Sequence, residues 1–292
     1  MSINLGLSLR QRAGLSPQVE AYVEPSGEQR FTYRELNAYA NRCAQALAAL
    51  DLQAGERVAL LMQNSVEFLG VFYGAAKLGL VVVPLNTRLA AAELAFILAD
   101  SGSKVLVYGP ECAETVKGIK ASQDHALALA SYVQAHPSSG DDHSLNALLE
   151  EASAAEPEIT GGGRDNLFIM YTSGTTGLPK GVVHTHESIS WAALSWATTM
   201  DIRYQDRMLL PLPMFHVAAL TAVMTCFLRG GTIVSMPAFD PMTVWQLIRE
   251  ERVNLGGAVP AILNFMRQVP DFETFDSPDL RCFITGAAPM PK

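Results

Sequence analysis

The sequence lacks several features that would assign a protein to a class at once. Its four cysteines, at positions 43, 112, 226 and 282, form no CxxC pair and no metal-ligand spacing. Cys43 falls on an apolar helix face and Cys226 within an apolar run, which favours buried, reduced thiols and a cytoplasmic location. Residues 1–15 contain no apolar stretch typical of a signal peptide, so none is predicted.

Long hydrophobic runs and excess positive charge are also missing. The longest apolar run, 217–228, has twelve residues and includes two threonines; it is too short to span a bilayer and indicates a core helix. The formal net charge of −8 argues against nucleic acid as the main partner. Arg10, Arg12, Arg203 and Arg207 offer a basic surface for weak peripheral membrane contact, and solvated surface arginine is the simpler interpretation.

The apolar and charged content nevertheless predicts a large folded protein. Of the 292 residues, 49% are hydrophobic and 17% are charged, enough for a substantial core. The pair Thr32 and Glu35 forms a capping box that opens a helix to about Leu50. Asn64, with Glu67, offers a cap for a second helix that runs to residue 78.

Strands and helices alternate along most of the chain. Apolar, β-branched runs predict a first series of strands at 57–62, 80–85 and 104–108, and a second series at 208–212, 232–236 and 281–285. Helical segments separate them, among them 90–99 and 243–252, whereas 126–165 has few clear signals. The alternation predicts mainly parallel sheets flanked by helices, in two α/β lobes at about 50–200 and 205–292.

The run YTSGTTGLPKGVV at 171–183 is the most informative segment. It follows an apolar strand, and Gly174 and Gly177 allow positive φ and close approach of the backbone to a ligand. Consecutive N–H groups can form an anion-binding nest. An ordinary polar hairpin loop is the alternative, but ten positions this constrained favour an anion site. Further donors for phosphate oxygens come from the side chains of Thr172, Ser173, Thr175, Thr176 and Lys180.

This loop is not a Walker A sequence, because Leu178 and Pro179 separate Gly177 from Lys180 and a second strand follows instead of a helix. The run resembles the signature of the adenylate-forming superfamily: acyl-CoA synthetases, adenylation domains of peptide synthetases, and luciferases. In that family the loop holds the β- and γ-phosphates of ATP, which is used with Mg²⁺. The resemblance implies that the ATP phosphates are bound by Thr172, Ser173, Gly174, Thr175, Thr176, Gly177 and Lys180.

Two other segments gain a meaning from the same resemblance. The run PLPMFHVAAL at 211–220 is similar to a family segment whose aromatic residue and histidine lie beside the acyl pocket, which implies Phe215 and His216 as pocket residues. Without the resemblance, His216 is better interpreted as a helix-capping histidine. The run TGAAP at 285–289 resembles a strand-end motif that packs against adenine and shapes the acyl pocket. It implies roles for Gly286, Ala287, Ala288 and Pro289, where composition alone indicates a turn.

The pocket segment also bears on the class of acid. Amino-acid-activating relatives carry a Phe-Asp pair whose aspartate binds the substrate ammonium, and here the pair is Phe215-His216. A buried ammonium without a counter-ion is costly, so a fatty or aryl acid is favoured. Asp240 comes later and is expected to cap the helix at Thr243 instead.

Segments at 41–44, 85–89 and 256–264 extend the likeness to actinobacterial long- and very-long-chain fatty-acyl-CoA synthetases along nearly the whole chain. The resemblance implies a parent enzyme that converts a long-chain fatty acid, ATP and CoA to acyl-CoA through acyl-AMP. An aryl- or short-chain acid ligase and a non-catalytic nucleotide-binding module remain the alternatives.

Several family segments have no counterpart in residues 1–292. These are the segment with the Mg²⁺-associated glutamate, the ribose-binding aspartate, the hinge, and the small C-terminal domain with its adenylation lysine. We therefore interpret 1–292 as a truncated N-terminal large domain, inactive alone, in which 1–49 join the 205–292 lobe. No catalytic residue or metal ligand is assigned within it.

Overall fold

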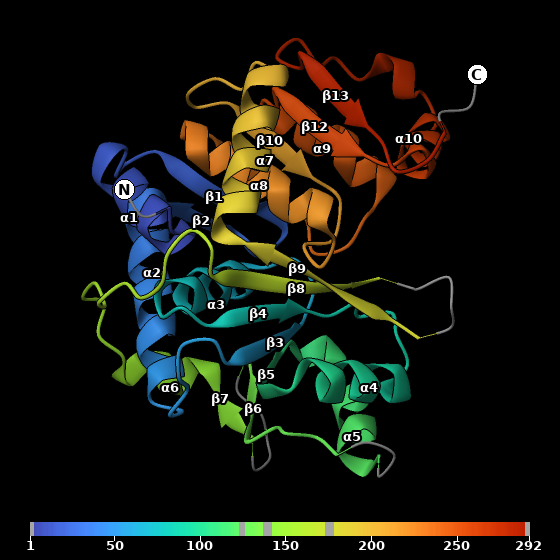
Figure 1. Cartoon of the computed structure of the whole chain (residues 1–292). Helices are drawn as coiled ribbons and strands as arrows, with labels where there is room; N and C mark the ends of the chain where they lie inside the picture. Colours follow the sequence, from blue (N-terminus) through green and yellow to red (C-terminus); the bar gives the residue numbers. More distant parts are fainter. Residues whose placement is uncertain (1–2, 123–125, 137–141, 173–177, 290–292) are drawn as a thin grey trace. The chain divides into compact units, whose positions relative to one another are not determined.

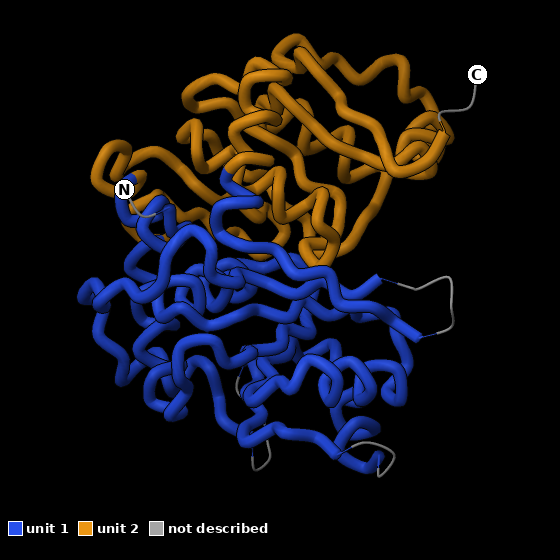
Figure 2. Tube along the Cα trace, viewed as in Figure 1, with its two compact units in different colours: residues 1–11, 37–190 blue, residues 12–36, 191–292 orange. Residues whose placement is uncertain are grey.

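The computed structural model describes residues 3–122, 126–136, 142–172 and 178–289. The chain divides into two compact units, unit 1 (1–11 and 37–190) and unit 2 (12–36 and 191–292) (Figure 2). The chain passes between them inside helices α1 (Leu5–Leu15), α2 (Tyr33–Ala48) and α7 (His186–Thr199). These positions differ from the predicted lobe boundaries near 49 and 200–205, because a continuous helix carries no loop signal where the chain changes unit. The domain assignment itself stays a prediction.

Unit 1 is built on a sheet of seven strands within the described residues (Figure 1). All neighbouring strands are parallel except the last pair, β8 and β9, which form an antiparallel hairpin. The strand order is β7 (His143–Ser144), β6 (Ser131–Gln134), β5 (Ser103–Tyr108), β3 (Arg57–Leu61), β4 (Val81–Pro84), β8 (Asn166–Thr172) and β9 (Lys180–Thr185).

Helices cover both faces of this sheet. One apolar core joins alternate residues of β3, β4 and β5 to α4 (Ala91–Ser101) and α5 (Ala113–Ala121). On the other face, Phe72 of α3 (Val66–Lys77) packs against Phe168 of β8 with ring centroids 6.1 Å apart. The helix α6 (Leu145–Glu151) and the short 3₁₀ helix Pro110–Cys112 complete unit 1. Strands β6 and β7 and helix α6 lie in the region for which the sequence showed few signals.

Unit 2 contains a six-stranded sheet within the described residues, parallel except for the hairpin of β1 and β2. Its order is β13 (Cys282–Thr285), β12 (Leu255–Ala258), β10 (Arg207–Leu210), β11 (Thr232–Ser235), β1 (Glu20–Glu24) and β2 (Gln29–Thr32). A core of Leu209, Val234, Val244 and Ile262 packs α9 (Pro241–Glu250) and α10 (Pro260–Arg267) on one face. Unit 2 also contains helix α8 (Val217–Arg229) and the 3₁₀ helices Pro25–Gly27 and Phe272–Thr274. The predicted fold class, mainly parallel sheets flanked by helices, is confirmed.

Local signals at the helix ends can be compared with the structure. The capping box at α2 is confirmed, since Thr32 N donates to Glu35 Oε2 at 2.8 Å and Glu35 N donates to Thr32 Oγ1 at 3.3 Å. The aspartate cap of α9 is also confirmed, with Thr243 N donating to Asp240 Oδ1 at 2.7 Å. The predicted Asn64 cap is wrong: Ser65 has the extended conformation of an N-cap, and its hydroxyl accepts from Phe68 N at 3.2 Å.

The cysteines in the described residues are free thiols. Cys43 and Cys226 are fully buried, as predicted, and burial raises the pKa of both thiols above the ordinary value. Cys282, on β13, is half-buried. Among the helices that the structure describes, none combines the length and apolar composition that a membrane span requires.

Candidate functional site

The two described ends of the 171–183 loop lie opposite each other in the β8–β9 hairpin. Thr172 is the last residue of β8 and pairs with Lys180, the first residue of β9, and both are exposed. Directly paired residues of an antiparallel ladder place their side chains on the same face, with Cβ atoms ~5 Å apart. The hairpin therefore presents the Thr172 and Lys180 side chains on one face. The other predicted phosphate-binding residues, Ser173, Gly174, Thr175, Thr176 and Gly177, lie outside the described residues.

The base of this hairpin is held firmly in unit 1. Phe168 of β8 is fully buried, and the Tyr171 hydroxyl donates to Asp100 Oδ2 of α4 at 2.5 Å. Burial, and then the Asp100 carboxylate, raise the pKa of Tyr171, so the phenol stays a donor. A side chain at Gly181 would place its Cβ 2.8 Å from Ile169 Cγ2, which explains why glycine follows Lys180. These contacts fix where the loop leaves and re-enters the sheet.

The predicted pocket residues Phe215 and His216 lie in unit 2 at the start of α8. Phe215 is buried, whereas His216 is exposed, and their rings are 4.6 Å apart between centroids. His216 occupies the N-cap position of α8, where its carbonyl accepts from Ala219 N and Leu220 N. Its side chain makes no capping hydrogen bond to the helix. The alternative of a capping histidine therefore holds for its backbone and not for its imidazole.

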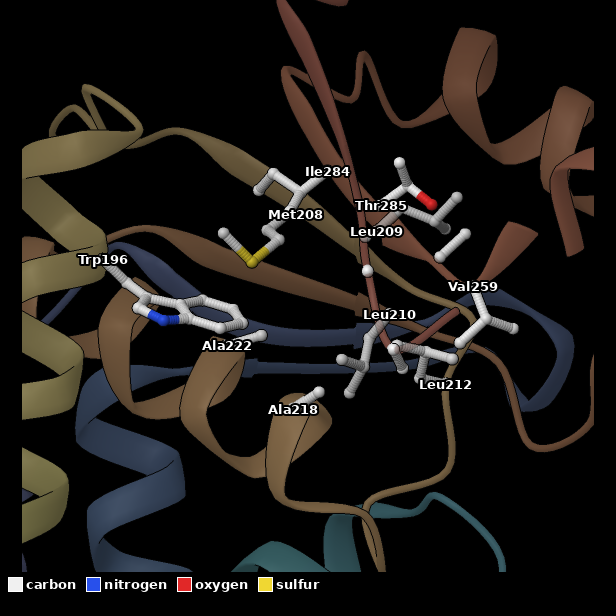
Figure 3. Close-up of a pocket in the computed structure, with 14 residues that line it drawn as sticks. Trp196, Met208, Leu209, Leu210, Leu212, Ala218, Ala222, Val259, Ile284 and Thr285 are labelled. Atoms are coloured by element: carbon white, nitrogen blue, oxygen red, sulfur yellow. The ribbon is translucent and has the colours of Figure 1, made fainter. Parts of the chain in front are cut away.

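A cavity of about 210 Å³ opens in unit 2 between its sheet and helices α7 and α8 (Figure 3). Its walls are almost wholly apolar, and none of the lining side chains is ionisable. The lining residues are Trp196 of α7; Met208, Leu209 and Leu210 of β10; Leu212; Ala218 and Ala222 of α8; Gly257, Ala258 and Val259; and Ile284, Thr285, Gly286 and Ala287.

The cavity exists because small residues meet at this place. Ala218 and Ala222 are one helical turn apart on α8 and face the same side. Gly257 and Gly286 have open space where a Cβ would stand. Larger side chains at these positions would fill the cavity. The lining residues Thr285, Gly286 and Ala287 are exposed, so the mouth of the cavity lies at the carboxyl ends of parallel strands, where α/β proteins commonly bind ligands.

Only part of the predicted adenine and acyl-pocket motif lines this cavity. Gly286 and Ala287 line it, whereas Ala288 and Pro289 are not among its lining residues; all four are exposed. Ala287 has a φ of 68°, the left-handed region that residues with a Cβ rarely adopt. Phe215 and His216 do not line the cavity either. Sequence reasoning missed Trp196, Ala218 and Ala222.

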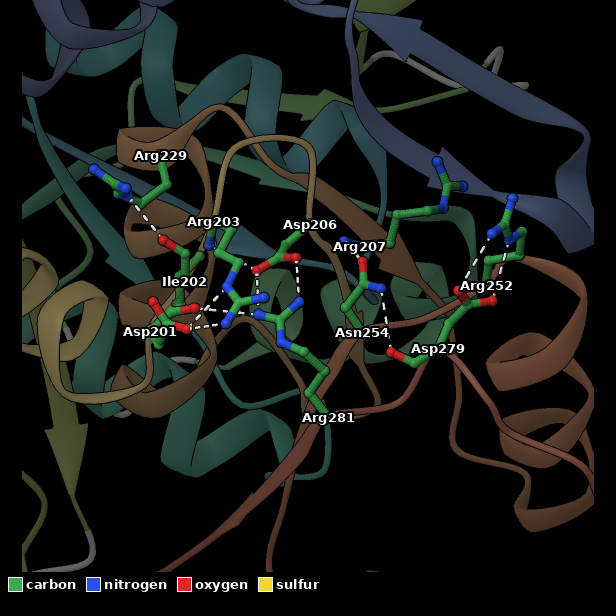
Figure 4. A network of polar contacts seen from close by, with 10 residues as sticks. All are labelled: Asp201, Ile202, Arg203, Asp206, Arg207, Arg229, Arg252, Asn254, Asp279 and Arg281. Carbon is green, nitrogen blue, oxygen red and sulfur yellow. Dashed lines mark hydrogen bonds and ion pairs between the residues drawn. The ribbon is translucent and has the colours of Figure 1, made fainter.

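Ion pairs hold the strands at the end opposite the cavity mouth (Figure 4). Arg281, just before β13, donates to both carboxylate oxygens of Asp206, at 2.7 and 2.8 Å, and Asp206 is 5% exposed. Asn254 joins the same ends, because its Oδ1 accepts from Arg207 N at 2.8 Å and its Nδ2 donates to the Asp279 carbonyl at 3.3 Å. The amino ends of β10, β12 and β13 are therefore tied together by side chains.

Most arginines of the predicted basic surface have partners in unit 2. Arg207 forms ion pairs with Glu20, at 2.7 Å, and with Glu251, and Arg203 forms one with Asp201. Arg12 donates to the carbonyl oxygens of the residues that end α8. Weak peripheral membrane contact stays a prediction.

The described residues contain no group of three or more His, Cys, Asp or Glu side chains that could hold a metal ion. The part of the chain that the structure covers therefore offers apolar volume, a hydroxyl and an ammonium group, and no ready metal cage.

Comparison with known proteins identifies relatives of this chain. Residues 9–292 match the family of AMP-binding enzymes. Long-chain-fatty-acid–CoA ligase FadD13 of Mycobacterium tuberculosis (strain ATCC 25618 / H37Rv) is 61% identical over 289 residues, which are 99% of this chain and 56% of that protein. Feruloyl-CoA synthase of Amycolatopsis sp. is 35% identical over 282 residues, 96% of this chain and 54% of that protein.

A solved structure agrees with these matches. The inhibitor-bound N-terminal domain of FACL13 from Mycobacterium tuberculosis has a TM-score of 0.94 and 60% identity, and the match covers 100% of this chain and 71% of that one. The chain spans about half the length of the curated relatives it matches. Because the family match extends over nearly all of its residues, the chain belongs to the AMP-binding enzyme family.

Proposed function

We propose that the protein containing this chain is an ATP-dependent ligase that converts a long-chain fatty acid to acyl-AMP and then to acyl-CoA. The observation that carries the proposal is the apolar cavity that ends at Gly286 and Ala287. It has room for an alkyl chain and no charged group that would select a polar acid. The 61% identity to FadD13 supports the same substrate class.

The reaction has two displacement steps. A carboxylate oxygen of the fatty acid attacks the α-phosphorus of ATP, the bond from that phosphorus to the β-phosphate oxygen breaks, and pyrophosphate leaves. The sulfur of CoA then attacks the acyl carbonyl carbon as the thiol loses its proton, and the bond to AMP breaks. A carboxylate is already ionised at neutral pH, so the first step needs no general base.

The main demand on the protein is to place and neutralise the phosphates. Charge builds on the departing pyrophosphate, and pre-arranged donors stabilise it. In this proposal Thr172 and Lys180 act with Ser173, Gly174, Thr175, Thr176 and Gly177 on the β- and γ-phosphates. Mg²⁺ would enter bound to those phosphates, whose charge it neutralises. Gly286, Ala287, Ala288 and Pro289 would border the adenine and the acyl group, and Phe215 and His216 the acyl pocket.

The first test is calorimetric titration of Mg-ATP into this chain beside a Lys180→Ala variant. A hydrogen bond to a charged group contributes ~1.5–3 kcal/mol, so the variant should bind ~10–100-fold more weakly. Lys117→Ala is the matched control, since the Lys117 side chain is 71% exposed on α5. Equal binding by wild type and Lys180→Ala would contradict the role proposed for the loop.

The catalytic part of the proposal needs a longer protein. The chain can be joined to the remaining part of FadD13, and pyrophosphate release measured with fatty acids of increasing length. Preference for long-chain acids over ferulate would support the proposal. The reverse preference would favour an aryl-acid ligase, which the 35% identity to feruloyl-CoA synthase makes the second candidate. Release of no pyrophosphate with any acid would favour a non-catalytic nucleotide-binding module.

The cellular setting follows from the same chemistry. A cytoplasmic enzyme would meet ATP and CoA in a reducing medium, which the buried free thiols Cys43 and Cys226 would tolerate. Weak peripheral contact with a membrane is tested by co-sedimentation with anionic liposomes at low salt. Protein that stays in the supernatant would exclude it.

A further inference from the structure

The cavity in unit 2 has a direction that follows from strand register. Strands β10, β12 and β13 are parallel, so their carboxyl ends lie together, and Gly286 and Ala287 follow the last residue of β13. Along β10 the lining residues run from Met208, near the amino end, to Leu212 beyond the carboxyl end. The strand from Met208 to Leu210 covers ~7 Å, and Leu212 lies beyond it. The cavity is therefore elongated, with its mouth at the 286–287 motif.

Helix α8 confirms this direction. It follows the carboxyl end of β10 and runs back along the sheet, so Ala218 in its first turn lies nearer the mouth and Ala222, one turn later, lies deeper. Figure 3 shows the same order: Leu212, Val259 and Thr285 lie at one end, and Ala222 and Met208 lie toward the other.

The indole of Trp196 stands at the deep end. In Figure 3 it lies beside Ala222 and Met208, on the side away from Val259 and Thr285. It is the largest of the lining side chains, and it comes from α7 and not from the sheet. The fully packed positions of α7 in unit 2 are Ala193 and Ala197, at 2% and 5% exposure, whereas Trp196 is half-buried and faces open volume.

We infer that Trp196 sets the length of acyl chain that the pocket accepts, by closing the end opposite the 286–287 motif. The inference rests on the proposed function, because it assumes that the alkyl chain enters with its carboxylate at the mouth. Each methylene that gains apolar contact improves binding about fourfold. A chain that reaches the indole gains nothing from a further methylene unless the ring moves.

Quenching of tryptophan fluorescence tests the geometry with this chain alone. Stearic acids that carry a nitroxide either near the methyl end or near the carboxylate are titrated into wild type and into Trp196→Phe, and the quenching lost in the variant is assigned to Trp196. We expect the methyl-end label to quench Trp196 more strongly. Equal quenching, or stronger quenching by the carboxylate-end label, would overturn the inference.

Equilibrium dialysis with the same labelled acids separates this result from failure of the proposed function. Binding with the wrong quenching pattern overturns the role of Trp196 and leaves the acyl pocket standing. Absence of binding overturns both. The dialysis therefore shows which of the two ideas has failed.

Chain-length profiles in the chimera with FadD13 provide the second test. Trp196→Ala should raise kcat/KM for acids longer than the wild-type optimum, by about fourfold for each methylene that gains contact, relative to shorter acids. Trp191→Ala is the matched control, because Trp191 lies on the same helix, is 60% exposed and does not line the cavity. Ala222→Phe should shift the optimum to shorter acids. A fall in kcat/KM by the same factor at every chain length in Trp196→Ala would contradict the inference.

Discussion

Replacing Glu156 by alanine removes the counter-ion of a positive charge that is buried in unit 1. The Lys77 side chain is completely buried, and its Nζ forms an ion pair with Glu156. Nζ also donates to Asn37 Oδ1 at 2.8 Å and to Asn41 Oδ1 at 2.7 Å. The other carboxylate oxygen of Glu156 accepts from the side-chain amides of both asparagines at 3.0 Å. One substitution therefore breaks a four-residue network and leaves the ammonium with two neutral partners.

The size of the effect follows from this geometry. Breaking a buried ion pair costs ~3–5 kcal/mol, and the 21% exposure of the Glu156 side chain lets water compensate part of the loss. The loss of unfolding free energy also has an upper limit, because burial already lowers the pKa of Lys77 and the ammonium can release its proton. Deprotonation at pH 7 costs about 5 kcal/mol for a lysine. We expect Glu156→Ala to reduce the free energy of unfolding by ~2–4 kcal/mol.

The assay is urea unfolding followed by far-UV circular dichroism. The three tryptophans, at 191, 196 and 245, all lie in unit 2, so their fluorescence reports on the other unit. Glu158→Ala, an exposed position two residues away, is the control and should change the free energy of unfolding by less than ~0.5 kcal/mol. A change in Glu156→Ala no larger than in this control would refute the reasoning.

Acid adds an independent check on the same pair. Burial alone would raise the pKa of Glu156, but the hydrogen bonds from Lys77, Asn37 and Asn41 lower it below the ordinary value. A carboxylate with a lower pKa in the folded state contributes stability above its unfolded pKa of about 4.3 and loses it as the pH falls. The difference in unfolding free energy between wild type and Glu156→Gln should shrink as the pH falls below about 5.

Four further substitutions test other parts of the fold. Gly74→Ala should destabilise the protein by ~1–3 kcal/mol, because the new Cβ would stand 2.8 Å from a backbone nitrogen of α2. Gly14→Ala has open space around the new Cβ and should stabilise the protein by ~0.5–1 kcal/mol. Urea unfolding measures both changes. Burial lowers the pKa of His186 to about 4, so the free energy of unfolding of the wild type should fall by ~3 kcal/mol between pH 6.5 and pH 4. An equal fall in a His186→Gln variant would contradict this. Arg281→Met should cost ~2–4 kcal/mol by leaving the buried Asp206 carboxylate without its bidentate partner, and an unchanged fluorescence-detected transition would argue against that role.

Elements governed by neighbouring residues could be predicted from the sequence. The Thr32–Glu35 box and the Asp240 cap act over three residues, and both lie where they were predicted. The cap of α3 was placed one residue early, because Asn64 and Ser65 are both good N-cap residues and only the backbone conformation chooses Ser65. Helix and strand alternation was sufficient for the fold class.

Features that depend on distant partners could not be predicted. Strand β1 has the sequence EAYVE, with no long apolar run, and its neighbour β11 lies some two hundred residues later. A lysine at the end of a helix, such as Lys77, is normally expected at the surface. Lys77 is nevertheless fully buried, because Asn37, Asn41 and Glu156 bind its ammonium group from other segments.

The candidate site shows the same division. A loop of glycines and hydroxyls indicates an anion site whatever its surroundings, so the 172–180 assignment could be made from residues alone, and it stays a prediction. The cavity arises where α7, α8 and three strands meet, which no single segment reveals. The spacing of Ala218 and Ala222 by one helical turn is a signal that could have indicated it.

The pairing of β1 with β11 has a consequence for the protein during its synthesis. Ala21, Tyr22 and Val23 are fully buried in the finished sheet, and Tyr22 pairs with Ile233. A ribosome adds ~5–20 residues per second, so this apolar strand waits roughly 10–40 s for its neighbour to emerge. By the end of that interval most of unit 1 has left the exit tunnel, while the β1–β2 hairpin of unit 2 is still exposed to chaperones. The nascent chain must therefore complete its second unit around a segment that was made first.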